Sequence, residues 1–126
     1  MKIFFPMLIL SMLVISCSNQ SSDQTLAFIP GTYVRTGATE FGRIDDTISL
    51  QIQNIHVNSF LIERRWLYKR VLDGVKQEPE YRITLDQGIY DPQTKLLQNQ
   101  KNLRLYSFDI KKGILYNNTT VYHKLK

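Results

Sequence analysis

Strict alternation between apolar and polar residues is the feature that most limits how this chain can fold. The segment Thr47–Gln53 reads Thr-Ile-Ser-Leu-Gln-Ile-Gln, so every second side chain is aliphatic. Successive side chains of a β-strand point to opposite faces, so Ile48, Leu50 and Ile52 would share one face, with hydroxyl and amide groups on the other. The pattern predicts a half-buried antiparallel strand.

A longer segment, Phe60–Val71, alternates in the same way and is richer in aromatic residues. One face carries Phe60, Ile62, Trp66 and Tyr68, and the other carries Leu61, Glu63, Arg65, Leu67 and Lys69. Arg64 falls on the apolar face. The β-branched and aromatic neighbours favour a strand over a helix. Shorter alternations follow at Tyr81–Leu85, Leu103–Leu105, Ile114–Tyr116 and Val121–Tyr122.

Turn signals separate these runs. Asp73-Gly74 is a dipeptide typical of a two-residue type I′ hairpin turn. The segments Tyr90–Leu97 and Phe108–Leu115 share a pattern of aromatic, Asp, three residues, Lys or Gly, an apolar residue and Leu. The pattern predicts two hairpins of one type, each with a left-handed residue, at Lys95 and Gly113.

The spacing of runs and turns predicts an all-β fold. We expect seven or eight short strands in a small antiparallel meander, forming either a closed barrel or a strongly curved sheet. The 126 residues allow one such domain. The twelve aromatic residues from Phe28 onward are expected to fill its core, and a mid-strand Trp66 is expected to belong to that core.

The start of the chain has a different composition. Lys2 precedes a nearly apolar run, Ile3–Ile15, which is too short to span a membrane and is typical of a cleaved secretory signal. The run ends in Leu13-Val14-Ile15-Ser16-Cys17, which resembles the lipobox of bacterial lipoproteins. The resemblance implies that the leader, residues 1–16, is removed and that Cys17 carries acyl chains. The alternative is an ordinary thiol, either beside an uncleaved anchor or buried.

A polar stretch follows the cysteine. Residues 17–25 are predicted to be the lipidated cysteine and a flexible tether, and residues 26–126 the β domain. By resemblance to lipoprotein sorting rules, Ser18 in place of Asp favours the outer membrane, facing the periplasm. Because Cys17 is the only cysteine, no disulfide within the chain can hold the domain.

The residues offer no constellation that points to catalysis. His56 and His123 lie far apart, without the spacing of metal ligands, and are expected to be exposed. Asp45-Asp46 is interpreted as a turn, and the six glycines form no phosphate-binding loop. We therefore predict no enzyme activity, no catalytic residue, no metal and no cofactor.

Basic residues give the leading candidate binding site. The chain has 16 Lys and Arg against 11 Asp and Glu. The candidate site consists of Arg64, Arg65, Trp66, Lys69 and Arg70, which could meet anionic headgroups or an acidic partner. The alternative is that these residues are solvated strand edges. Nucleic acid is not an expected partner, because the chain is predicted to be exported.

A second resemblance covers most of the chain after the leader. The segments Ile29–Val34, Asp45–Ile48, Ile62–Arg65, Asp73-Gly74 and Gly113–Leu115 with Tyr122–Leu125 are similar to small lipoproteins encoded in conjugative transfer elements. That family implies a cellular setting and no catalytic residues.

Together these features predict an outer-membrane-anchored lipoprotein. It would be a non-enzymatic interaction or assembly module of the cell envelope, held to the membrane by its lipid and bound to an envelope protein. The second resemblance implies a link to conjugative transfer. One alternative is a lipocalin-like carrier of a small apolar ligand, with Trp66, Tyr68 and Tyr81 lining its cavity. Another is an inhibitor of an envelope hydrolase.

Overall fold

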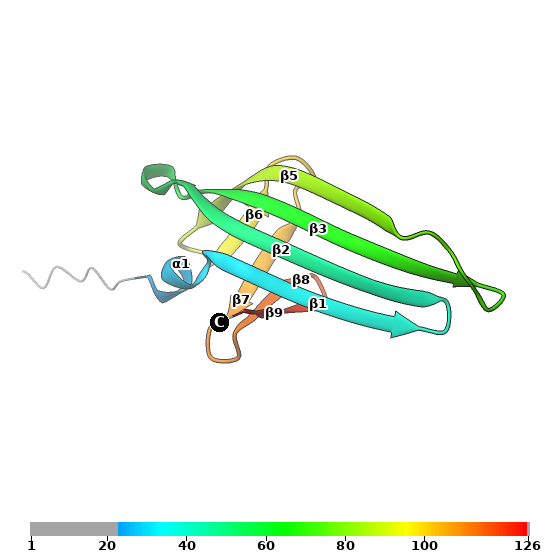
Figure 1. Cartoon of the computed structure of the whole chain (residues 1–126). Coiled ribbons are helices and arrows are strands. Elements are labelled where there is room, and N and C mark those ends of the chain that lie inside the picture. The colour runs from blue at the N-terminus through cyan, green and yellow to red at the C-terminus, as the bar shows by residue number, and fades with distance from the viewer. Residues whose placement is uncertain (1–22, 126) are drawn as a thin grey trace, which may run out of the picture.

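The computed structural model describes residues 23–125, and these form an all-β domain (Figure 1). A short helix and a 3-10 turn accompany the strands. The elements are α1 Gln24–Phe28, β1 Gly31–Thr39, β2 Gly42–Asn54, η1 Ile55–Val57, β3 Ser59–Leu72, β4 Val75–Lys76, β5 Glu80–Asp91, β6 Leu96–Asn99, β7 Leu105–Asp109, β8 Ile114–Asn117 and β9 Thr120–Lys124. Cys17 and its acylation lie outside the described residues.

Eight of the strands close into an antiparallel barrel. The order is β2-β1-β9-β8-β7-β6-β5-β3, and β2 also pairs with β3, which completes the ring. The strand β4 lies outside the ring and pairs only with the end of β3. Of the two architectures that the sequence allowed, the structure therefore has the closed barrel.

The hairpin turns follow the predicted chemistry. Asp73 and Gly74 both have positive φ, 51° and 75°, as a type I′ turn requires. The two related hairpins have their left-handed residues at Lys95, φ 62°, and Gly113, φ 66°, which confirms that prediction.

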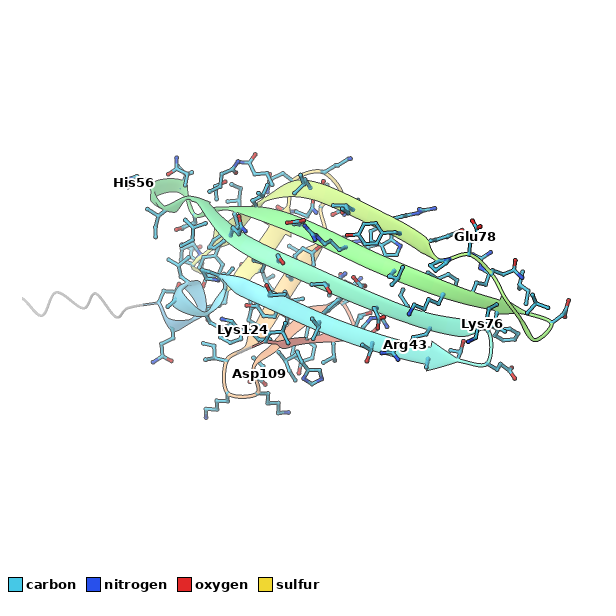
Figure 2. All side chains as sticks on the ribbon, in the orientation of Figure 1. Arg43, His56, Lys76, Glu78, Asp109 and Lys124 are labelled. Atoms are coloured by element: carbon cyan, nitrogen blue, oxygen red, sulfur yellow. The ribbon has the colours of Figure 1, made fainter. Side chains whose placement is uncertain are left out.

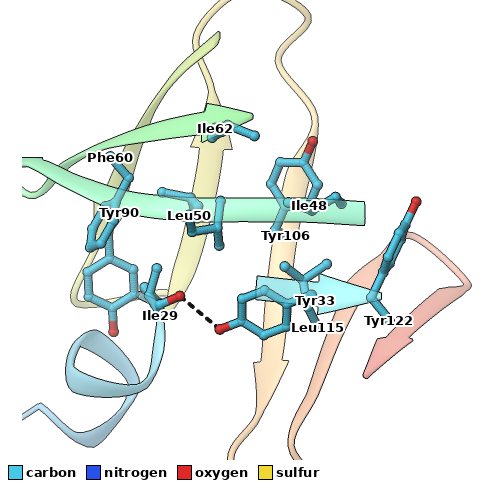
Figure 3. Packing of buried hydrophobic residues seen from close by; sticks show 11 residues of the cluster. Ile29, Tyr33, Ile48, Leu50, Phe60, Ile62, Tyr90, Tyr106, Leu115 and Tyr122 are labelled. Atoms are coloured by element: carbon cyan, nitrogen blue, oxygen red, sulfur yellow. Dashed lines mark hydrogen bonds between the residues drawn. The ribbon is translucent and has the colours of Figure 1, made fainter. Parts of the chain in front are cut away.

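The core lies inside the ring and combines aliphatic side chains with four tyrosines (Figure 3). The Tyr33 hydroxyl donates a hydrogen bond to the Ile29 carbonyl oxygen, 2.8 Å away, so its polar atom is satisfied although the ring is buried. The buried cluster consists of Ile29, Tyr33, Ile48, Leu50, Phe60, Ile62, Tyr90, Leu97, Tyr106, Leu115 and Tyr122. Only part of the expected aromatic core is therefore found here; Trp66 and Tyr68 are half-buried, while Phe41 and Tyr81 are exposed.

Four strands are much longer than the barrel needs (Figure 1). On one side, β9 pairs with β1 only at Tyr33 and Val34; on the other, β6 pairs with β5 only from Gly88 to Asp91. Beyond these points β1, β2, β3 and β5 continue as an open sheet, which we call the protruding sheet. Along residues 80–87 of β5 it extends for roughly 25 Å at the usual rise per residue.

Two boundaries differ from the sequence predictions. The expected tether ends inside α1, because the Asp23 carboxylate accepts a 3.1 Å hydrogen bond from the Leu26 N–H and caps the helix. Leu103 was expected in a strand but lies in a loop with φ 61°. The side-chain oxygen of Asn99 accepts bonds from the Lys101 and Asn102 amides and so shapes that loop.

Candidate binding surface

The barrel interior continues directly onto one face of the protruding sheet, which we call the inner face. The register aligns Ile48, Arg64 and Thr84 across β2, β3 and β5, and the next row holds Asp46, Trp66 and Arg82. Because alternate residues share a face, Arg64 and Trp66 lie in line with the core residues Phe60 and Ile62. The inner face therefore starts apolar inside the barrel and becomes basic and aromatic outside it.

A buried carboxylate marks the boundary between these two regions. Asp46 is 1% exposed and accepts two hydrogen bonds from Arg64, Nε to Oδ1 at 3.1 Å and Nη2 to Oδ2 at 2.8 Å. The Tyr122 hydroxyl donates a third bond to Oδ2, at 2.6 Å. The hydrogen bond to Asp46 raises the pKa of Arg64, while burial and the same carboxylate raise the pKa of Tyr122 to about 12.

Arginines and aromatic rings alternate beyond this ion pair. The Arg64 guanidinium lies 4.8 Å from the Trp66 ring centroid, and the Arg82 guanidinium lies 5.9 Å from it. Farther out, Arg70 lies 5.2 Å from the Tyr68 ring centroid. These distances suit cation–π attraction, which holds the guanidinium groups in place. We call the group Arg64, Trp66, Tyr68, Arg70 and Arg82 the arginine–aromatic cluster.

Two of the cluster's three arginines, Arg70 and Arg82, form no salt bridge among residues 23–125, whereas Arg64 is neutralised by Asp46. The carboxylate of Glu80 is nevertheless close by, since Glu80 pairs in register with Tyr68 and lines a surface pocket with Arg70. At the barrel mouth, Arg35 lies 6.0 Å from the Tyr122 ring, and its buried Nε has no hydrogen-bond partner among residues 23–125. The cluster can therefore offer several free N–H donors to an anionic group.

The five residues of the predicted site do not share one face. Arg64, Trp66 and Arg70 lie on the inner face, whereas Arg65 and Lys69 lie on the opposite, outer face, as the alternation predicted. There Arg65 donates to Glu63, Nε to Oε1 at 2.6 Å. Lys69 is paired in register with Arg43, whose side chain contacts Asp45. The inner-face residues alone form a continuous surface.

Three contributors to this surface were missed from the sequence. Asp45-Asp46 was interpreted as a turn, which is wrong: both residues lie within β2, paired on one side with β1 and on the other with β3. A signal was present, since Asp46 is in step with Ile48 and Leu50, and an arginine on an apolar face needs a counter-ion. Tyr122 and Arg82 carried no comparable signal, because their partners are distant in sequence.

The two histidines lie away from the arginine–aromatic cluster. Both His56, in η1, and His123, on β9, are exposed, as expected (Figure 2 labels His56). Within residues 23–125 no group of three or more His, Cys, Asp or Glu side chains could hold a metal ion. None of the helices in the same range is long and apolar enough to cross a membrane.

A separate apolar cavity lies at the other end of the barrel. It has a volume of about 320 Å³ and is lined by Asp23, Leu26, Ala27, Pro30, Ile52, Ile55, Asn58, Ser59 and Phe60. Burial alone would raise the pKa of Asp23, but hydrogen bonds from the Leu26 N–H and the Tyr90 hydroxyl, with the Lys95 ammonium, lower it. The prediction that Trp66, Tyr68 and Tyr81 would line the cavity of a carrier is wrong. Tyr81 lies on the outer face opposite Leu67, so the three residues share no cavity.

The chain was compared with known proteins. It matches no protein-family model, and comparison with curated proteins and with solved structures returned no match.

Proposed function

We propose that this protein is a non-enzymatic cell-envelope lipoprotein that binds an acidic protein partner through the inner face of its protruding sheet. The observation that carries the proposal is the arginine–aromatic cluster, which lies outside the closed barrel and holds the guanidinium groups of Arg70 and Arg82, neither of which forms a salt bridge among residues 23–125. Arginine and aromatic side chains are the residues most enriched at the centres of protein interfaces.

The chemistry of the cluster favours carboxylates as the bound groups. A guanidinium can donate two parallel hydrogen bonds to one carboxylate, and stacking on a ring reduces the entropy lost when it does so. The rings of Trp66 and Tyr68 add apolar area between the charges. An acidic polypeptide with interspersed apolar residues would match both properties.

The position of the cluster is compatible with a lipid anchor at Cys17. The described chain begins at Asp23, beside α1, and the free ends of β1–β2 and β3–β4 lie at the opposite end of the molecule (Figure 1). An anchor joined at the α1 end would leave the inner face unobstructed. We further propose the outer membrane, facing the periplasm, as the location, and an envelope complex such as a conjugative transfer apparatus as the setting, on the basis of the two sequence resemblances.

Neighbouring residues on opposite faces provide a matched test of the surface. Arg70→Glu and Trp66→Ala change the inner face, whereas Lys69→Glu and Leu67→Ala reverse a charge and truncate an apolar side chain on the outer face. After crosslinking in cells and pull-down, we expect the inner-face variants to lose a partner that the outer-face variants retain. Equal capture by all four variants, or no envelope partner for the wild-type chain, would contradict the proposal.

The anchor is tested separately. Cys17→Ala removes the only residue that a lipid could modify in this way, so the variant should leave the membrane fraction after a salt wash. Variant protein that still pellets with the membranes would argue against lipidation.

The apolar cavity beside α1 favours a second candidate function, the carrier of a small apolar ligand. Its volume of about 320 Å³ lies at the lower end of the range for ligand pockets. Ala27→Trp should fill the cavity. If an environment-sensitive fatty-acid probe binds the wild-type chain and not this variant, the cavity is a ligand site; no binding to either would remove this candidate.

A further inference from the structure

The strand β5 has an unpaired edge along most of its length. It pairs with β3 from Glu80 to Ile89, but with β6 only from Gly88 onward. The last backbone bond on the β6 side runs from the Gln100 N–H to the Gln87 carbonyl oxygen, at 2.8 Å. Residues 81–86 therefore have no backbone partner on this side within the described chain.

The direction of the Gln87 carbonyl shows which residues offer their backbone at this edge. The N–H and C=O of one strand residue point to the same side, and this alternates along the strand. Like Gln87, therefore, Tyr81, Ile83 and Leu85 direct their N–H and C=O groups outward. Their side chains lie on the outer face, opposite Leu67, Arg65 and Glu63, and are 57%, 49% and 61% exposed.

Such an edge is a template for another strand. Exposed, apolar edge strands without proline are the ones that pair with other chains, and most proteins shorten, charge or cover them. Here a long edge remains open beside three large apolar side chains. The other open edge of the protruding sheet, beyond Val34 on β1, is shorter and carries Thr36 and Ala38 in the equivalent positions.

We propose that β5 pairs with β5 of a second copy of this chain, antiparallel, about a two-fold axis through Thr84. Backbone hydrogen bonds form only where a residue with outward N–H and C=O groups lies opposite such a residue of the other copy. This register meets the requirement, because it places Ile83 opposite the partner's Leu85. It also places Arg82 opposite the partner's Asp86, and the axis repeats both pairs. Neither Arg82 nor Asp86 has a salt-bridge partner among residues 23–125.

The adjacent symmetric registers are less favourable. An axis through Ile83 would bring Glu80 opposite the partner's Asp86, and like charges in directly opposed positions are destabilising. An axis through Leu85 would place Arg82 opposite the partner's Gly88 and Thr84 opposite the partner's Asp86, so no opposite charges would meet across the edge. Of these three registers, only the axis through Thr84 pairs opposite charges, and it joins Ile83 to the partner's Leu85 through backbone groups that are free among residues 23–125.

The pairing goes beyond the proposed function: it uses the edge of β5 and shares only Arg82 with the arginine–aromatic cluster. A two-fold axis perpendicular to the sheet keeps both inner faces on the same side and places the two α1 ends at opposite ends of the pair. A dimer lying along a membrane could therefore use both anchors and present two arginine–aromatic clusters to one partner.

A cysteine crosslink tests the axis directly. Thr84 would face its own copy at a non-hydrogen-bonded position, where Cα atoms are about 4.5 Å apart, within disulfide range. We expect purified full-length Thr84→Cys to form a reducible dimer under mild oxidation. Wild type, with Cys17 as its only thiol, and Thr36→Cys, on the β1 edge, should form far less. Crosslinking of Thr84→Cys no greater than that of these controls would overturn the proposal.

A charge exchange tests the register. In sedimentation of the full-length chain, Arg82→Asp should raise the dimer dissociation constant roughly tenfold. The substitution places a carboxylate opposite the partner's Asp86, and the two-fold axis repeats this repulsive pair. Adding Asp86→Arg should restore the wild-type value. A wild-type chain that stays monomeric at about 100 µM, or a folded double variant without restored affinity, would contradict the pairing.

Asp86 also accepts a 3.0 Å bond from Asn99 Nδ2, so a third variant avoids this contact. Leu85→Pro removes an N–H group that points away from β3, so every hydrogen bond between β5 and β3 remains. We expect this variant to lose the dimer while its far-UV circular dichroism stays unchanged. A folded Leu85→Pro variant that dimerises like the wild type would equally overturn the proposal.

Discussion

The hydroxyl of Tyr122 lies 2.6 Å from Oδ2 of Asp46, although the two residues are 76 positions apart in the chain. Tyr122 belongs to β9 and Asp46 to β2, and both strands pair with β1, which lies between them. The hydrogen bond therefore spans β1 at the barrel mouth. It links the closure of the barrel to the ion pair that begins the arginine–aromatic cluster.

Removal of this hydroxyl should weaken the fold. In Tyr122→Phe, Asp46 keeps Arg64 but loses one buried donor, and we expect the free energy of unfolding to fall by about 1–2 kcal/mol. Tyr116→Phe is the matched control, because Tyr116 is only half-buried and no side-chain hydrogen bond of its hydroxyl is found among the described residues. Urea denaturation measures both, and equal effects would show that the bond to Asp46 contributes nothing specific.

Neutralising the buried carboxylate should cost more. Asp46→Asn leaves the guanidinium of Arg64 without its counter-ion, and we expect a loss of about 3 kcal/mol, since Arg64 is partly exposed. Asp45→Asn removes the adjacent carboxylate, which faces solvent and pairs with Arg43, and should change stability by less than about 1 kcal/mol. A small effect of Asp46→Asn in thermal unfolding would show that solvent already neutralises this site.

Alkaline pH should unfold the protein. Burial raises the pKa of Tyr33, Tyr90, Tyr106 and Tyr122 above the ordinary value of 10, to about 12 for Tyr90 and Tyr122. Above pH 10 the unfolded chain therefore binds fewer protons than the folded one, so stability is intact below pH 10 and falls as the pH rises toward 12. Tyrosine ionisation followed by ultraviolet absorbance should coincide with loss of circular dichroism. Ionisation of all seven tyrosines near pH 10 in a folded protein would contradict this account.

Gly88 lies where β5 passes from its open edge into the barrel, and it should not tolerate a larger residue. A Cβ atom there would lie 2.7 Å from Ile62 Cδ1 and 3.1 Å from Leu97 Cδ1, both in the core. We expect Gly88→Ala to destabilise the protein by about 1–3 kcal/mol through overpacking. At Gly37, on the protruding sheet, the closest atom would be 3.2 Å away, so Gly37→Ala should have the smaller effect on the melting temperature.

Much of the fold could be predicted because its signals are local. The alternation at Thr47–Gln53 and Phe60–Val71 lies within β2 and β3, and the positive φ angles at Asp73-Gly74, Lys95 and Gly113 follow from turn chemistry. These elements depend on neighbours in sequence.

What could not be predicted depends on distant partners. Alternation at Tyr81–Leu85 suggested an apolar face turned toward a core, yet these side chains face outward, because Arg82 and Thr84 occupy the inner face. The pattern gives the period of a strand but not which face is covered. In the same way, the pairing of Asp46 with Arg64 required the register of β2 on β3, which no local motif specifies.

The closing contact of the barrel also constrains when the domain can fold. The pairs Tyr33 with Lys124 and Val34 with His123 join β1, near the start of the described chain, to β9, near its end. Until Thr120–Lys124 has been synthesised, β1 lacks a partner on that side, and the chain has a high contact order that slows folding. A nascent chain therefore cannot close its barrel before its last strand has been made, which would suit the export that we propose.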